Sequence, residues 1–151
     1  MPKASVKRLI ECNKNQLIDL VLDIEKYPDF VPFCLDAHVY ERKNEGDLIL
    51  IIADLTIGKG PFKDTYKSDV KFSKKDNTIK VTNIGGPLNY LENTWHFKEH
   101  ENGTEIFFHI DFEIENKFLN IVMTKSFQFG LDKIADAFQK RAEDLFGNSK
   151  N

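Results

Sequence analysis

The sequence predicts an α+β fold, in which a curved antiparallel sheet of seven strands wraps around one long C-terminal helix, in a single domain over residues 1–151. Three observations predict it. Between residues 36 and 115, short segments of strand character alternate with turn signals, as in an antiparallel meander. One amphipathic helical pattern ends the chain. The length of 151 residues suits one hydrophobic core, and no linker or repeat divides it.

The elements are expected in a simple order. A first strand over residues 4–11 precedes a helix, for which Asn13 or Asn15 is a suitable N-cap. This helix should end at or before Tyr27, because Pro28 cannot continue it. Turn signals then separate six further strands, which are expected over residues 36–43, 47–57, 62–74, 78–84, 89–100 and 104–115.

The segment EKYPDFVPFC, residues 25–34, is unusually apolar for a loop. Its two prolines exclude a regular helix or a central strand, since each removes a backbone donor. Such a loop must be kept from water, and two interpretations fit: it forms the rim of a cavity mouth, or it plugs the end of the core. The candidate ligand-binding residues of this loop are Tyr27, Phe30, Val31, Pro32 and Phe33.

The last two strands predict their own pairing. Asn102-Gly103 is a strong signal for a two-residue hairpin turn. With that turn, Trp95 opposes Ile110, and the apolar faces of both strands coincide. The same register places Phe97 opposite Phe108, Asn93 opposite Phe112, and His96 opposite His109 on the outer face.

Asn93 and Trp95 therefore point into the fold, as does Asn83 by alternation with its neighbours. Trp95 is a candidate ligand contact, with a core residue as the alternative. A buried amide without a partner costs about 1–3 kcal/mol. Asn93 must therefore meet a backbone group, a water molecule, the other amide or the polar group of a ligand.

The final helix is expected over residues 117–146, with Gly147 as its terminator. Its predicted apolar stripe contains Phe127, Leu131, Ile134, Phe138, Ala142 and Leu145. The first four of these are expected to line a cavity facing the sheet. The preceding segment KFLNIVM, residues 117–123, is apolar on nearly every side, which suits a lid, a bilayer contact or packing against the loop.

The totals narrow the function classes. A net charge of −3 argues against a nucleic-acid binder driven by overall charge, and no DNA partner is expected, although a local basic patch is compatible with it. The two cysteines, Cys12 and Cys34, give neither a disulfide framework nor a metal-binding spacing, so no metal is expected. Without a signal-peptide pattern, we expect a bacterial cytoplasmic protein, with peripheral contact to the inner membrane as an alternative.

Four segments resemble one known family in the right order: DIEKYPDFVPFC, GPFKDTYKSDV, GGPLNYLENTWHF, and the ending from DFEIENKFLNIVM to AFQKRAEDLFG. Together they resemble the coenzyme Q-binding and ribosome association toxin (RatA) branch of the START-like helix-grip superfamily. The resemblance extends from about Val6 to Gly147. Phe33 stands where this family usually has Trp, so an indole donor is lost, and Asp64 stands where Glu is common.

The resemblance implies an apolar cavity between sheet and long helix that binds a polyisoprenoid quinone, such as ubiquinone, or another lipid. In the quinone branch the protein is a carrier that supports respiration, with transient membrane contact. In the other branch it acts on the large ribosomal subunit as the toxin of a toxin–antitoxin pair. The sequence does not separate the two, and quinone binding is the first choice.

An enzyme is the third alternative, because START-like folds include aromatase/cyclases. Catalysis would need an acid or base that faces the cavity. His96, His109, Asp54, Asp111 and Glu113 all face outward in the predicted strands. We therefore expect a non-catalytic protein with no catalytic residues and no cofactor of its own beyond the bound quinone or lipid.

Overall fold

The computed structural model describes the backbone of residues 3–59, 62–85, 88–114 and 117–146. Within these ranges, the side chains of residues 59, 62, 64, 85, 88–89, 114 and 117–130 lie outside the description. The expectations for Asp64, Phe127, Gly147 and segment 117–123 as a lid or bilayer contact therefore fall on residues or side chains that are not described.

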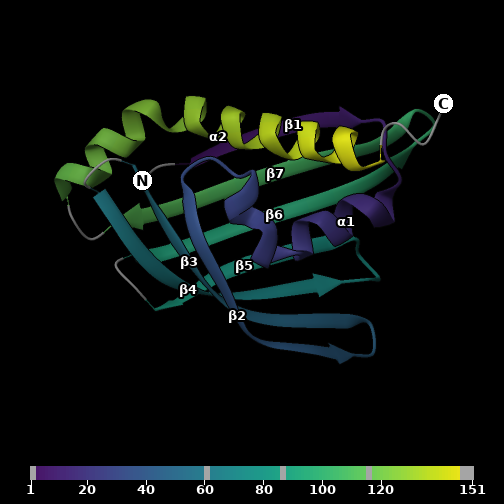
Figure 1. Ribbon diagram of the computed structural model, residues 1–151, viewed down its shortest axis with the longest axis horizontal. Helices are drawn as coiled ribbons and strands as arrows, with labels where there is room; N and C mark the ends of the chain where they lie inside the picture. The colour runs from purple at the N-terminus through teal and green to yellow at the C-terminus, as the bar shows by residue number, and fades with distance from the viewer. Residues whose placement is uncertain (1–2, 60–61, 86–87, 115–116, 147–151) are drawn as a thin grey trace.

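The seven strands form one antiparallel sheet, as predicted, and their order is β1-β7-β6-β5-β4-β3-β2, so that the first strand pairs with the last (Figure 1). The strands are β1 (Lys3–Ile10), β2 (Cys34–Glu45), β3 (Leu48–Lys59), β4 (Phe62–Ser73), β5 (Thr78–Gly85), β6 (Leu88–His100) and β7 (Gly103–Ile114). The helices are α1 (Lys14–Leu22), the short 3₁₀ helix η1 (Ile24–Asp29) and the long helix α2 (Lys117–Phe146).

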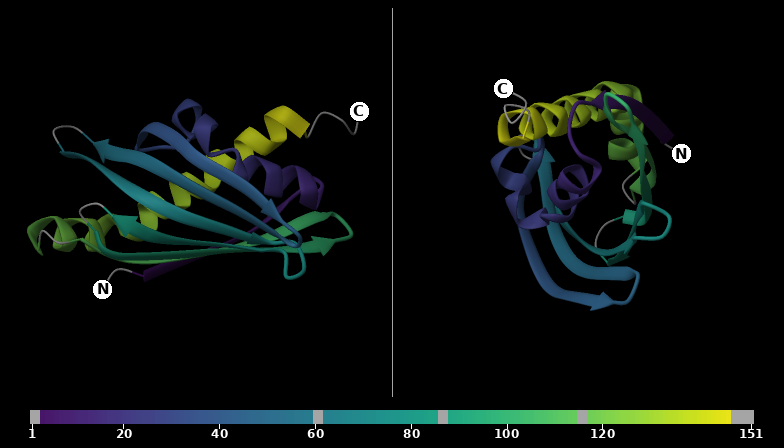
Figure 2. Two further views of the ribbon diagram at one scale, coloured as in Figure 1. Left: turned by 90° about the horizontal axis from the view of Figure 1, so that it is seen from below. Right: turned by 90° about the vertical axis from the view of Figure 1, so that its right-hand side faces the viewer.

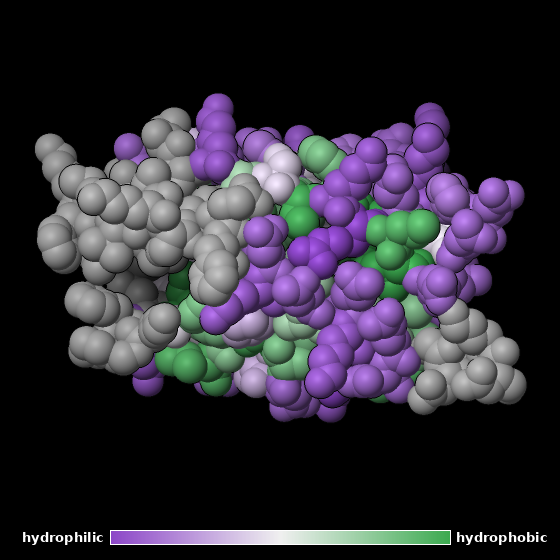
Figure 3. All heavy atoms as spheres, turned by 90° about the horizontal axis from the view of Figure 1, so that it is seen from above, coloured by the Kyte–Doolittle hydropathy of each residue, from purple (hydrophilic) through white to green (hydrophobic). Residues whose placement is uncertain are grey.

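The sheet curves around the helices, and α1 and η1 share its concave side with α2 (Figure 2). Five residues of the nine-residue helix α1 are buried. The concave face is thus covered by α1, η1 and α2, where the sequence predicted one covering helix. Over the described part of α2, the face that looks away from the sheet is mostly hydrophilic (Figure 3). No helix in the described ranges is long and apolar enough to cross a bilayer.

Asn13 is the N-cap of α1. Its side chain accepts a hydrogen bond from the backbone N–H of Asn15 at 2.8 Å, and the Gln16 side chain accepts one from the Asn13 N–H. This capping box satisfies helix donors that would otherwise lack partners. The helix stops at Leu22, before Pro28 can act. Pro28 instead lies inside the 3₁₀ helix η1, a short element that the sequence did not predict.

The predicted register of the last hairpin is wrong by two residues. His100 pairs with Gly103, so Glu101 and Asn102 make the turn, and Trp95 opposes Phe108. A shift by two keeps every side chain on its own face, and Trp95 and Asn93 still point inward. Across the hairpin, Phe97 opposes Ile106 and Asn93 opposes Ile110.

The predicted contact between His96 and His109 is also wrong. His96 lies opposite Phe107, with the ring centroids 6.2 Å apart, and His109 lies opposite Thr94. Both histidines remain on the outer face, but in successive rows.

The conformation of Gly103 explains the shift. Its φ is +144°, and a Cβ atom there would lie 2.2 Å from the carbonyl oxygen of Ile10. Gly103 is therefore needed where the end of β1 closes onto β7. The adjacent Thr104 hydroxyl donates to the carbonyl oxygen of Cys12 at 2.9 Å, which holds the same corner.

The apolar stripe of α2 is largely confirmed for its described part. Leu131, Phe138 and Ala142 are buried and Ile134 is half-buried. The last position is wrong, because Leu145 is 52% exposed and the next residue, Phe146, packs on the core. Relative to Ala142, positions 145 and 146 lie about 60° and 40° away on opposite sides around the helix, and Phe146 is the one that contacts the core.

We expect Gly103→Ala to lower the free energy of unfolding by about 1–3 kcal/mol, because the new methyl group meets the Ile10 carbonyl and the φ is unfavourable. Gly46→Ala is the matched control. Gly46 also has a positive φ, +65°, but nothing lies within 4 Å of the position that its new methyl group would take. Chemical denaturation should show the larger loss for Gly103; equal losses would contradict the role of the close approach.

Candidate functional site

Five aromatic side chains join the loop, the long helix and the sheet. We call this group, Tyr27, Phe30, Trp95, Phe108 and Phe138, the aromatic junction. The Phe138 ring lies at its centre, 5.4 Å from the Tyr27 centroid, 5.1 Å from Phe30 and 5.1 Å from Trp95. All three contacts are edge-to-face, a favoured geometry for aromatic pairs. Trp95 continues the group to Phe108 on β7 at 4.2 Å.

The first half of the apolar loop is thus anchored to the core. The Tyr27 hydroxyl donates to the carbonyl oxygen of Val21, and burial raises the pKa of Tyr27 far above its usual value. Phe30 packs between Tyr27 and Phe138, and the Arg141 guanidinium lies 5.1 Å from its ring centroid. These contacts are those expected of a core plug.

The second half of the loop is half-buried at Val31, Pro32 and Phe33. Phe33 has a φ of +70°, a left-handed conformation that is uncommon for such a side chain. Its carbonyl oxygen accepts the Gly58 N–H at 2.9 Å, which directs the chain into edge strand β2. A cavity mouth formed by these three residues remains a prediction.

A β-bulge follows the loop. The register shifts between Cys34 and Asp36, and the intervening Leu35 is 53% exposed. Cys34 is buried, its thiol donates to the Asp36 carbonyl oxygen at 3.6 Å, and burial raises its pKa to about 11. This thiol is therefore protonated and unreactive near neutral pH.

Asn93 carries a buried amide oxygen with no hydrogen-bond partner among the described residues. It lies on the concave face, between Val81 of β5 and Ile110 of β7. An unpaired amide in such apolar surroundings costs about 1–3 kcal/mol. Asn83 has a different environment, because its side-chain oxygen accepts the Leu91 N–H at 2.7 Å.

Strand β4 adds two polar side chains that the sequence reasoning missed, Tyr66 and Ser68. Ser68 is 1% exposed and lies directly opposite Asn83. Its hydroxyl makes no hydrogen bond of normal geometry within the described residues, but it lies near enough to Tyr66 to lower that pKa slightly. Burial, the larger effect, raises the pKa of Tyr66. Alternation with the buried Val70 could have placed both residues inward.

The structure brings part of the predicted ligand site together. Trp95 and Phe138 are in contact, with Tyr27 and Phe30 around them. Leu131, 2% exposed, belongs to the same core cluster, and Ile134 packs against it. Asn93 lies one inward position along β6 from Trp95. The concave face therefore offers an apolar aromatic wall, with an Asn93 amide oxygen that has no partner among the described residues close by.

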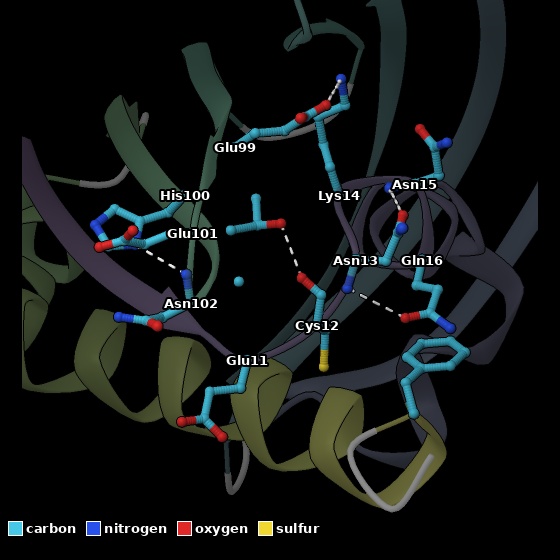
Figure 4. Close-up of a pocket in the computed structure, with 13 residues that line it drawn as sticks. Glu11, Cys12, Asn13, Lys14, Asn15, Gln16, Glu99, His100, Glu101 and Asn102 are labelled. Atoms are coloured by element: carbon cyan, nitrogen blue, oxygen red, sulfur yellow. Dashed lines mark hydrogen bonds and ion pairs between the residues drawn. The ribbon is translucent and has the colours of Figure 1, made fainter. Parts of the chain in front are cut away.

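A separate depression of about 690 Å³ lies beside the turn between β6 and β7 (Figure 4). It is lined by the start of α1, the β6–β7 turn and Phe146, and most of its side chains are polar. The Lys14 ammonium and the Glu99 carboxylate form an ion pair of 2.9 Å across it, and the capping box uses the donors at the start of α1. This depression is not the predicted apolar site.

The sequence profile described as "Polyketide cyclase / dehydrase and lipid transport" matches residues 12–139, most of the chain. The chain belongs to this family. It is 32% identical over 141 residues to the ribosome association toxin RatA of Rickettsia prowazekii, covering 91% of this chain and 94% of that protein. It is 31% identical over 140 residues to the mitochondrial coenzyme Q-binding protein COQ10 of Dictyostelium discoideum, covering 91% and 67%.

Among solved structures, a START superfamily protein from Mycobacterium smegmatis superposes with a TM-score of 0.78 at 18% identity, covering 95% of this chain and 98% of that one. The START-like helix-grip fold is thereby confirmed. The polyketide cyclase/dehydrase and lipid transport family includes cyclases, whereas the curated relatives above carry the names of a toxin and a binding protein.

The two halves of the loop are expected to respond differently to substitution. Phe30→Ser should lower the free energy of unfolding by about 1.5–3 kcal/mol, because Phe30 packs on Phe138. Phe33→Ser, outside the aromatic junction, should lower stability less than Phe30→Ser and mainly reduce retention of co-purified lipid. Thermal melting and mass spectrometry of a lipid extract measure the two effects. Equal melting losses with unchanged lipid would show that the whole loop is a core plug.

Proposed function

We propose that this protein binds an apolar molecule with a polar head, such as a polyisoprenoid quinone, between the concave face of the sheet and α2. The unpaired amide of Asn93 beside the aromatic junction is the observation that supports this most directly. Ligand sites are typically apolar, with a few polar groups that fix the orientation of the ligand. A quinone matches that pattern, with a long hydrocarbon tail and two carbonyl oxygens.

The chemistry of the head group follows from the amide. An Asn side chain offers a carbonyl oxygen and an NH₂ group, and a rotation of 180° about its last bond exchanges their positions. In one orientation Asn93 donates to a quinone carbonyl; in the other it accepts from the hydroxyl of the reduced quinol. Either hydrogen bond would satisfy a buried group that has no partner among the described residues.

Binding and delivery, rather than catalysis, is the activity we propose. The described titratable groups between loop and sheet are Tyr27, Cys34 and Tyr66, and burial raises the pKa of each. All three are therefore neutral near pH 7 and poorly suited to general acid–base chemistry. We propose no cofactor beyond the bound quinone or lipid, and transient contact with a membrane as the route of exchange.

Asn93→Leu is expected to weaken binding of a short-chain coenzyme Q analogue about tenfold, the equivalent of one lost hydrogen bond. The ligand-free variant should be as stable as the wild type or more so, since an unpaired buried amide has been removed. Trp95, the one tryptophan of the chain, is buried beside the site, and quenching of its fluorescence by the analogue reports binding.

Asn83→Leu is the matched control. It breaks the hydrogen bond to the Leu91 N–H and should cost about 1–3 kcal/mol of stability, with little effect on affinity. If Asn93→Leu binds the analogue with unchanged affinity, Asn93 does not contact the head group. If neither wild type nor variants bind any quinone or lipid, the proposed function itself fails.

A second candidate function is association with the large ribosomal subunit. The observation that favours it is the 32% identity with a ribosome association toxin over 91% of this chain. Adding purified protein to ribosomes should then raise the proportion of free subunits in a sucrose gradient. An unchanged profile at saturating protein would exclude this candidate.

A further inference from the structure

The pairing register places a row of basic and hydroxyl side chains across the outer face of the sheet. Each residue of the row is the direct partner of the next, from β1 on one edge to β2 on the other. We call this set the basic row: Ser5, His109, Thr94, Lys80, Lys71 and Lys43, with Leu50 between the last two. None of the seven is acidic, although the chain has a net charge of −3.

The centre of the basic row is electrostatically unfavourable in the isolated protein. Lys71 and Lys80 are exposed and lie directly opposite each other. Opposed side chains have Cβ atoms about 4.5–5.5 Å apart, and like charges at this distance repel. Within the described residues, neither ammonium group forms an ion pair; the carboxylates of Asp69 and Glu92 lie in the next row. An anionic partner would relieve this repulsion.

The next row across the outer face contains three acidic residues and one lysine, Lys3 of β1, which forms a 3.8 Å ion pair with Asp111. Asp111, Glu92 and Asp69 follow one another across β7, β6, β5 and β4, with Thr82 between the last two. Lys43, at the edge of the basic row, forms a 3.0 Å ion pair with Glu41, so the free charge is concentrated at Lys71 and Lys80. The outer face thus has a row rich in positive charge beside a row rich in negative charge, although the net charge of the chain is −3.

An exposed aromatic ring lies beside the basic row. Phe107, 40% exposed, is one position along β7 from the row and lies opposite His96. The imidazoles are held by hydroxyl groups on neighbouring strands, His109 by Ser5 at 2.8 Å and His96 by Thr78 at 3.3 Å. Lys80 and Lys71 lie on the same face, two and three strands away from the Phe107 ring. Ammonium groups and an exposed ring on one surface are the combination that single-stranded nucleic acids bind.

The curvature of the sheet favours a flexible polyanion over a flat anionic bilayer as the partner of the basic row. The basic row crosses the strands and therefore follows the arc of the sheet (Figure 2). Successive residues are about 4.8 Å apart, the spacing between strands. A flat anionic bilayer can touch only part of a convex row, whereas a flexible polyanion can follow it. The row also includes serine and threonine hydroxyls, which can accept from a ribose 2′-OH.

We propose that the outer face binds single-stranded RNA, with phosphates along the basic row at Lys71 and Lys80 and a base stacked on Phe107. This surface lies on the opposite side of the sheet from Asn93, so it does not depend on the quinone site. The outer face is thus a surface through which the second candidate function, association with the large ribosomal subunit, could act. The proposed RNA binding rests on that function only for the identity of the RNA in the cell.

The test uses the full-length protein and a fluorescent 16-nucleotide oligouridine, with anisotropy measured between 50 and 200 mM salt. Each phosphate contact contributes about −0.7 to the slope of log K against log[salt] for a single strand. The double variant Lys71→Gln/Lys80→Gln should therefore make the slope shallower by about 1.4. Between 50 and 200 mM salt, the affinity of this variant should fall about sevenfold less than that of the wild type. Lys133→Gln/Lys140→Gln, with the same charge change on α2, should leave the slope unchanged.

Phe107→Ser separates stacking from charge. It should weaken binding about tenfold at every salt concentration, within the range for loss of one stacked base, and keep the wild-type slope. Equal slopes for the two lysine pairs, tighter binding to oligothymidine than to oligouridine, or binding only to phosphatidylglycerol vesicles would overturn the proposal. If Lys71→Gln/Lys80→Gln abolishes oligouridine binding but still frees ribosomal subunits, the RNA surface stands and the ribosome uses another one.

Discussion

The packing around Phe138 is the interaction on which the rest of this structure depends. One ring on α2 contacts the loop through Tyr27 and Phe30 and the sheet through Trp95. Without it, three elements far apart in the sequence would lose their common point of contact. The loop can be apolar and contain prolines because this packing removes its rings from water. The amide of Asn93 is desolvated for the same reason, since it lies beside that packed region.

The fold was predictable because strand alternation tolerates errors of register. The hairpin was predicted two residues out of place, yet Trp95 and Asn93 were correctly assigned to the inner face. A side-chain period of two makes any even shift harmless to the faces and harmful only to the pairs. The predicted contact between His96 and His109 depended on the exact pairing of the two strands, and it is wrong. Its cause, the approach of Ile10 to Gly103, joins residues 93 positions apart and has no local signal.

The sequence predicted which side chains of the candidate site point to the inner face, but not which hydrogen bonds they make. Asn83 and Asn93 both point inward by alternation, but one accepts a backbone N–H and the other has no described partner. The difference depends on where the pairing of β5 with β6 ends: the last pair is Thr82–Glu92, and the next N–H on β6, that of Leu91, bonds to the Asn83 side chain instead. Tyr66 and Ser68 were within reach of the same alternation argument. The contacts of Phe30 were not, since no pattern in a proline-containing loop fixes its docking.

The two surfaces of the sheet are linked by its curvature. Side chains on the concave face converge, which brings Asn93, Trp95 and the helices close enough to exclude water. On the convex face side chains diverge, so the ammonium groups of Lys71 and Lys80 can splay apart more than their opposed backbone positions suggest. That divergence reduces, without removing, the repulsion between the two ammonium groups. A flatter sheet would make both arrangements worse: the inner face would lose its enclosure, and the outer row would repel itself more strongly. The same bend therefore encloses the apolar residues of the inner face and spreads the basic row of the outer face, on adjacent residues of the same strands.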